Sequence, residues 1–459
     1  MKKLALLLVA FVALYSCEQE PKVDYTLFSG KIDNPVGKNI IVLKGREAVK
    51  SIDLNDDGTF SDTLRVEPGY YAVRHGRESS SIYLNPGDNL NLTLNPEEFD
   101  ESIAYTGEGS ANNNYLAAKY LTDEKLSGDF TKVFAMEEAD FLAKITEIND
   151  AKAKLLNDTE NISEDFKALE EKNLEFEHLI NIQNYPSYHA YYGKKDGFEA
   201  SEEFLKPLEA VDYTNADYYK SLINYKRLVQ GHYSNRISES DNPSEVFDDI
   251  VKNGSEELKT DLSRMLNYDV APNNAHNEAY YNGLMAMSSD DEFKNKLTAK
   301  YDKVKKLAKG MPSPKFENYE NHKGGTMSLE DLKGKFVYVD VWATWCGPCI
   351  REIPSLKAVE SEYHDKNIEF VSVSVDRGSD YEKWMEMVND KELGGTQLFA
   401  DKTYKGGAIA DINTNFIRDY AIEGIPRFIL IDPEGNIVDA DAPRPSNPKL
   451  RTLFDELKI

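Results

Sequence analysis

The strongest constraint on the fold is an apolar run that leads directly into two cysteines three residues apart. Residues 336–342 (FVYVDVW) are apolar except for Asp340 and predict a buried strand. Cys346 and Cys349 follow within one turn of each other, and residues 351–363 repeat apolar side chains on one helical face. The dithiol is therefore expected where a strand ends and a helix begins, as in an α/β domain.

This placement predicts how the two thiols react. The unpaired N–H groups and the dipole at a helix N-terminus favour negative charge, so the pKa of a cysteine there is lowered. We expect Cys346, as the more exposed of the pair, to attack a substrate disulfide. Cys349, one helical turn deeper, should then resolve the mixed disulfide.

Other uses of a C-x-x-C pair fit less well. The chain has three cysteines, so no second cysteine pair is available to complete a structural zinc site. A c-type haem needs histidine directly after the second cysteine, and Ile350 stands there. We therefore predict no metal and no other cofactor.

The residues around the dithiol resemble those of the thioredoxin family. Residues 345–349 read WCGPC, and residues 420–426 (YAIEGIP) match the family signature that ends in a cis-proline. The resemblance implies that Pro426 is cis and that the backbone of Ile425 faces an extended substrate strand. It assigns substrate binding to Trp345, Gly347, Pro348, Ile425, Pro426 and Arg427.

The same resemblance singles out Asp340, six residues before Cys346, where thioredoxins carry a buried acid. We expect it to accept the proton of Cys349, with a pKa raised by desolvation. Two positions depart from the family. Arg427 replaces the usual threonine after the cis-proline, so a cation there would stabilise the thiolate or select acidic partners. Ser372 stands where thioredoxins place a lysine, which predicts a different proton path.

The domain is longer than a minimal thioredoxin. The extra residues 377–417, with the lead-in 316–334, resemble the TlpA/ResA branch of envelope thiol–disulfide oxidoreductases. The resemblance implies that the substrates are disulfide-containing exported proteins. Gly-Pro between the cysteines is the dipeptide of reducing thioredoxins, so we expect a reductase that a membrane thiol electron donor recharges. A disulfide isomerase or oxidase remains the alternative.

The N-terminus predicts an export signal. Residues 4–14 are an unbroken apolar run behind two lysines, too short to span a bilayer. Residues 14–17 (LYSC) resemble a bacterial lipoprotein box, so residues 1–17 are expected to be a signal peptide that ends at a lipidated Cys17. Plain secretion and an uncleaved anchor are the alternatives. Glu18 after the cysteine favours the outer membrane, with the periplasmic or surface face left open.

A chain of 459 residues is too long for one compact core. Period-two alternation with turn signals predicts a β-sandwich over residues 18–107. Helical spacing then predicts an all-α region over residues 108–310, and a Pro-rich break opens the thioredoxin-like α/β domain at residues 311–459. The predicted fold class is therefore multidomain.

The net charge and the large N-terminal part bear on partners. The formal net charge is −26, from 80 acidic and 54 basic residues, which argues against nucleic acid binding. No catalytic motif occurs in the first 300 residues. A binding or scaffold lipoprotein with a secondary redox domain is therefore a further alternative.

Overall fold

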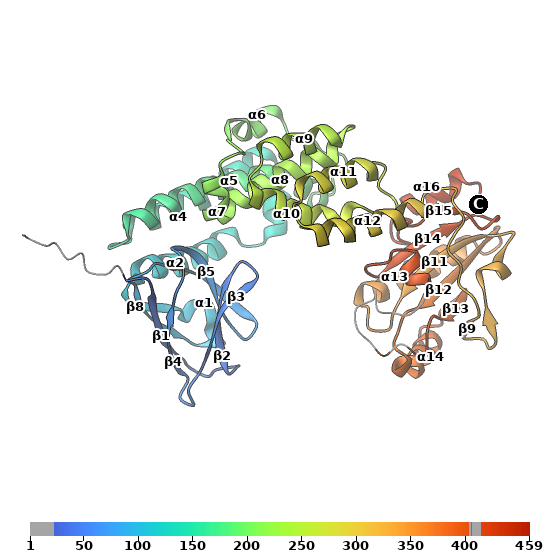
Figure 1. Ribbon diagram of the computed structural model, residues 1–459, viewed down its shortest axis with the longest axis horizontal. Coiled ribbons are helices and arrows are strands. Elements are labelled where there is room, and N and C mark those ends of the chain that lie inside the picture. Colours follow the sequence, from blue (N-terminus) through green and yellow to red (C-terminus); the bar gives the residue numbers. More distant parts are fainter. Residues whose placement is uncertain (1–22, 404, 406–414) are drawn as a thin grey trace, which may run out of the picture. The chain divides into compact units, whose positions relative to one another are not determined.

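The protein is described by a computed structural model of residues 23–403, 405 and 415–459 (Figure 1). The chain divides into two compact units, Met1–His232 and Tyr233–Ile459. The expected signal peptide and the lipidated Cys17 lie outside the described residues. Within the described ranges, every helix is too short or too polar to cross a membrane.

The first unit opens with two four-stranded sheets, ordered β4-β1-β7-β8 and β3-β2-β5-β6. Side chains alternate between buried and exposed along β7, as a strand with one covered face requires. Buried residues of both sheets form a single hydrophobic core. The strands are β1 (Thr26–Ile32), β2 (Asn39–Lys44), β3 (Glu47–Asp53), β4 (Thr59–Leu64), β5 (Gly69–His75), β6 (Glu78–Leu84), β7 (Asn89–Leu94) and β8 (Ala104–Glu108).

The long helices begin where the apolar pattern of the sequence changes from strand spacing to helical spacing. Strand β8 ends at Glu108, and α2 starts at Ser110. After the short α1 (Phe99–Ser102), those of the first unit are α2 (Ser110–Ser127), α3 (Phe130–Phe134), α4 (Glu138–Asp158), α5 (Glu164–Tyr192), α6 (Glu202–Leu205), α7 (Ala216–Ser221) and α8 (Ile223–Glu239), which runs across the unit boundary. The second unit continues with α9 (Pro243–Asn253), α10 (Glu256–Leu266), α11 (Asn277–Met287) and α12 (Asp291–Lys306).

A buried polar cluster lies among the helices of the first unit. Glu170 on α5 is fully buried. Its carboxylate accepts hydrogen bonds from Tyr70 (2.5 Å), Lys119 (2.6 Å), Asn173 (3.2 Å) and Tyr115 (3.3 Å). Four donors satisfy this carboxylate, and one of them is a cation that balances its charge.

The rest of the second unit is built on a seven-stranded mixed sheet, ordered β10-β9-β13-β12-β11-β14-β15. Strands β11, β12 and β13 are parallel, and β14 pairs with β11 in the antiparallel sense. The strands are β9 (Tyr319–Asn321), β10 (Thr326–Met327), β11 (Phe336–Trp342), β12 (Ile368–Ser374), β13 (Thr396–Phe399), β14 (Arg427–Ile431) and β15 (Ile437–Asp439), and the helices are α13 (Gly347–Glu362), α14 (Tyr381–Asp390), α15 (Asn415–Asp419) and α16 (Lys449–Glu456).

The central strand β11 serves a core on each face. Val337, Val339 and Val341 belong to one hydrophobic cluster, whereas Tyr338 packs with residues of α13 and α16 in another. Side chains two residues apart on a strand share a face, so Asp340 points to the same side as Tyr338, toward α13. The period of the strand therefore places the buried acid beneath the helix that follows the cysteines.

Candidate active site

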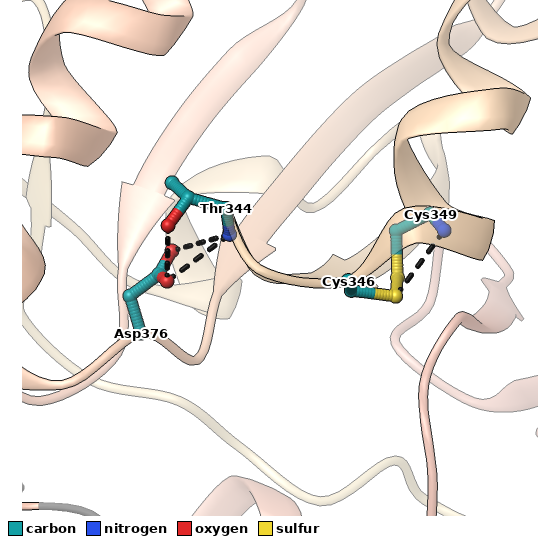
Figure 2. Close-up of a disulfide and its surroundings, with 4 residues drawn as sticks. All are labelled: Thr344, Cys346, Cys349 and Asp376. Carbon is teal, nitrogen blue, oxygen red and sulfur yellow. Dashed lines mark hydrogen bonds between the residues drawn. A yellow bond between two sulfur atoms is a disulfide. The ribbon is translucent and has the colours of Figure 1, made fainter. Parts of the chain in front are cut away.

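Cys346 and Cys349 lie at the start of α13 and are joined by a disulfide bond, with their Cα atoms 5.3 Å apart (Figure 2). Cys346 is the N-cap residue of the helix, and the backbone N–H of Cys349 donates to its Sγ at 3.2 Å. The helix therefore starts at Gly347, whereas the apolar pattern of the sequence predicted helix only from residue 351. A thiolate of Cys346 would receive the same N–H donor, which lowers the pKa of a cysteine.

The two cysteines are equally exposed, although Cys346 was expected to be the more exposed of the pair. Each is 4% exposed, so the prediction that Cys346 is the more exposed is wrong for the disulfide form. The physical reason is that both side chains belong to the same hydrophobic cluster once their sulfurs are bonded. Trp345 beside them is 52% exposed, and Gly347 and Pro348 are exposed in the first helical turn.

The Ile425–Pro426 peptide bond is cis, as the family resemblance implied. Ile425 packs against the hydrophobic cluster that contains both cysteines. Arg427 follows on β14, and its Nη1 lies 2.7 Å from Asp441 Oδ2. Part of the charge expected to act on the dithiol is therefore balanced by an acid within the domain.

A second buried acid holds the loop that carries the dithiol, and sequence analysis missed it. The carboxylate of Asp376 accepts the backbone N–H of Thr344 at 3.0 Å and its hydroxyl at 2.8 Å, as Figure 2 shows. The Ser374 hydroxyl donates to the same carboxylate at 2.8 Å. Because Thr344 lies two residues before Cys346, Asp376 fixes the approach to the helix. Asp376 follows the carboxyl end of β12, the strand parallel to β11, and this position is the signal that could have identified it as a site residue.

Asp340 is buried, at 8% exposed, and lies opposite Ser372 in the register of β11 and β12. Ser372 Oγ is 3.5 Å from its Oδ2, a long and weak contact. The pKa of Asp340 is raised from 3.8 to about 7, chiefly by burial; the charges of Glu360 and Glu352 contribute to the rise, and the Ser372 hydroxyl opposes it. With serine in place of the family's lysine, no cation of the described ranges forms an ion pair with this acid.

A small cavity joins Asp340 to Cys349. Its interior of about 10 Å³ is at the limit of what one water molecule needs. The cavity is lined by Asp340, Trp342, Cys349, Ile353, Leu356, Lys357, Glu360, Ser372, Leu393, Gly394 and Gln397. An acid and the second cysteine thus face the same space, which permits a proton to pass between them directly or through one water.

Metal coordination finds no support in the described ranges. Among residues 23–403, 405 and 415–459, no cluster of three or more His, Cys, Asp or Glu side chains is arranged to hold an ion. The chemistry that the described side chains provide is that of a dithiol beside a buried acid.

Comparison with known proteins identifies the C-terminal part. Residues 308–454 match the Redoxin family. The thiol-disulfide oxidoreductase ResA of Bacillus cereus is 27% identical over 134 residues, which cover 29% of this chain and 69% of that protein. ResA of Oceanobacillus iheyensis is 34% identical over 113 residues, covering 24% of this chain and 52% of that protein.

Solved structures from Bacteroides are also similar. The thioredoxin domain of a thiol-disulfide oxidoreductase from Bacteroides vulgatus is 30% identical and covers 33% of this chain and 98% of its own, with a TM-score of 0.28. A thioredoxin-like protein from Bacteroides caccae is 15% identical and covers 57% of this chain and 94% of its own, with a TM-score of 0.40. The family match and the ResA relatives establish that residues 308–454 form a Redoxin domain, a thioredoxin-like thiol–disulfide oxidoreductase domain of the ResA type.

Proposed function

We propose that the protein reduces disulfide bonds of exported proteins by exchange through Cys346 and Cys349. The observation that carries this proposal is the disulfide at the start of α13, with its sulfurs at a helix N-terminus. The Gly347-Pro348 dipeptide, as in reducing thioredoxins, supports the reducing direction over an oxidase or isomerase. Trp345, Ile425, Pro426 and Arg427 are the proposed substrate contacts.

The proposed cycle uses the residues of the site in order. The Cys346 thiolate attacks one sulfur of the substrate disulfide, and the other sulfur leaves as a thiolate. Asp340 then takes the proton of Cys349, whose thiolate attacks Cys346 and releases the reduced substrate. The Cys346–Cys349 disulfide that results must be reduced by a thiol electron donor, which we place in the membrane.

We infer an envelope location from the N-terminal sequence. The apolar run at residues 4–14 and the box that ends at Cys17 support a lipid anchor, and Glu18 supports the outer membrane. A lipid chain on Cys17 would leave Cys346 and Cys349 as the only thiols of the mature chain. Labelling with a radioactive fatty acid tests the anchor, and Cys17→Ser should abolish the label.

Trapping of mixed disulfides tests the exchange. Cys349→Ser should hold substrates covalently on Cys346, because the resolving thiol is gone. Cys346→Ser should trap them weakly through Cys349, and a variant with both cysteines replaced should trap none. Equal capture by all three variants would contradict the proposal.

A binding or scaffold function is the second candidate, and a groove in the first unit favours it. Helices α4, α5, α7 and α8 line a groove of about 590 Å³ together with the segment 207–215. A scaffold should bind its partner equally well with both Cys346 and Cys349 replaced, whereas a reductase should not retain it.

We propose domains at residues 18–107, 108–310 and 311–459. The two N-terminal sheets are proposed to form a β-sandwich, since their buried side chains form one core.

A further inference from the structure

A second acidic side chain lines the cavity that joins Asp340 to Cys349. Four of the five residues of α13 that line the cavity recur at steps of four, three and four: Cys349, Ile353, Leu356 and Glu360. Such spacing places them on one face of the helix. The face that carries the resolving cysteine therefore carries a carboxyl group toward the same space.

Glu360 fits there because two glycines, Gly394 and Gly395, face its carboxylate. A Cβ atom at Gly394 would lie 2.4 Å from Glu360 Oε2, and one at Gly395 would lie 3.1 Å from Oε1. The first distance is too short for any real contact, so a side chain at residue 394 would displace the carboxylate. Gly395 also has a φ of 61°, which favours glycine.

The Glu360 carboxylate has no fixed partner. Within the described ranges, no side chain or backbone group makes a hydrogen bond or an ion pair with it. The two lysines that face it donate elsewhere: Lys357 Nζ donates to Lys391 O at 3.0 Å and Lys323 Nζ to Gly395 O at 3.3 Å. A half-buried carboxyl group without fixed hydrogen bonds can gain and lose a proton without breaking the structure around it.

The electrostatics of Glu360 match those of Asp340. The pKa of Glu360 is raised from 4.5 to about 7, chiefly by burial; the charge of Glu369 on β12 contributes to the rise, and Lys357 and Lys323 oppose it. The pKa of Asp340 is also about 7. Two acids of similar pKa exchange a proton at neutral pH with little free-energy difference between the two states.

Resting on the proposed exchange function, we propose that Glu360 is a positioning residue for the resolving step, acting through Asp340. Asp340 removes the proton of Cys349, the new thiolate attacks the Cys346 sulfur, and the bond to the substrate sulfur breaks as the Cys346–Cys349 bond forms. The substrate leaves as a thiolate that takes a proton from water. The proton on Asp340 passes to Glu360, directly or through one water, and then to solvent. The two protein thiols are oxidised and the substrate disulfide is reduced by two electrons.

The test separates attack from resolution in the full chain. Reduced protein is mixed in a stopped-flow instrument with the small disulfide dithiobis(nitrobenzoate). The first thionitrobenzoate released reports attack by Cys346, and the second reports resolution by Cys349. Glu360→Gln should slow the second phase roughly tenfold at pH 7 and remove one ionisation near neutrality from its pH profile. The first phase should be unchanged.

Two further variants keep the result specific. Glu362→Gln, on the same helix but exposed and paired with Arg451, should leave both phases as in the wild type. Gly394→Ala, which displaces the Glu360 carboxylate, should slow the second phase as Glu360→Gln does. A second phase unchanged in rate and pH profile in Glu360→Gln would overturn the relay, as would equal slowing of both phases. A wild-type protein that releases no thionitrobenzoate would overturn the proposed function itself, and the relay with it.

Discussion

Two buried carboxylates, Glu170 in the first unit and Asp340 in the second, show opposite solutions to the same physical problem. Glu170 is fully buried and accepts hydrogen bonds from four donors, one of them the ammonium group of Lys119. Asp340 is almost as buried, yet the side-chain hydrogen bond it makes within the described part of the chain is the long approach of Ser372 Oγ. A buried charge is costly unless it is paired and hydrogen-bonded.

The difference separates a structural acid from a reactive one. The donors around Glu170 satisfy its carboxylate oxygens, so the group ties β5, α2 and α5 together. Asp340 has no such set of donors among the residues that the structure describes, and burial raises its pKa toward neutrality, where a proton acceptor is useful. Asp376 lies between the two: its bonds to Thr344 and Ser374 give it a structural task beside the dithiol and lower its pKa, but burial still raises that pKa above its usual value.

The largest expected effect comes from removing the cation of the first cluster. Lys119→Met should lower the free energy of unfolding of the first unit by about 3–5 kcal/mol, since Glu170 stays buried without its cation. Urea denaturation followed by far-UV circular dichroism measures this loss. Tryptophan fluorescence gives an internal reference, because Trp342, Trp345 and Trp384 all lie in the second unit.

The matched control is Lys172→Met, which breaks an exposed pair with Glu175 on α5. Exposed pairs contribute about 0–1 kcal/mol, so this variant should unfold almost as the wild type does. If the two variants unfold at the same urea concentration, the cluster around Glu170 is not the structural tie described above.

Asp340→Asn should have the opposite sign. The folded protein keeps the proton of Asp340 up to about pH 7, whereas the unfolded chain releases it near pH 3.8, so wild-type stability falls as the pH rises between these values. Asparagine removes this slope. The variant should therefore gain up to about 4 kcal/mol at pH 8 and nothing below about pH 4. Urea denaturation followed by tryptophan fluorescence at both pH values measures the difference, with the exposed Asp365→Asn as control.

If the free energy of unfolding depends on pH in Asp340→Asn as it does in the wild type, the carboxyl group of Asp340 does not have the raised pKa. The same variant should also slow the release of the second thionitrobenzoate while leaving the first release unchanged.

Asp376→Ala should cost about 1–3 kcal/mol of stability, because the N–H and hydroxyl of Thr344 lose their acceptor in a buried place. Asp376→Asn retains one acceptor oxygen and should recover part of the loss. Both changes are measured by tryptophan fluorescence in urea. If the wild type and both variants are equally stable, Asp376 does not stabilise the loop that carries the dithiol.

The smallest stability effect is expected at the surface beside the dithiol. Trp345→Ala should change the free energy of unfolding by less than about 0.5 kcal/mol, because about half of the residue is exposed and it lies at the surface. If Trp345 contacts substrate, KM for a protein disulfide should rise while the rate with dithiobis(nitrobenzoate) stays near that of the wild type. An unchanged KM would exclude this residue from substrate binding.

The sequence predicts best what is local along the chain. Strand β11 has the expected ends, residues 336 and 342, because it is an apolar run interrupted only by Asp340. The buried position of Asp340 followed from its spacing to Cys346 and from family resemblance. The cis bond before Pro426 followed from resemblance alone.

Contacts between neighbouring strands could not be predicted in the same way. The bond between Asp376 and Thr344 depends on the register of β12 against β11, which no local pattern reveals. The pairing of Arg427 with Asp441 depends on the fold of the last strands. The position of Glu360 depends on two glycines more than thirty residues downstream that leave space for it.

The reduction potential of the Cys346–Cys349 pair tests the central claim most directly. The full-length protein is equilibrated with dithiothreitol buffers, and the fraction of free thiols is counted by alkylation and mass spectrometry. A reductase should give a value near that of thioredoxin, roughly −270 mV. A value of roughly −120 to −180 mV would contradict the account and indicate an oxidase or isomerase.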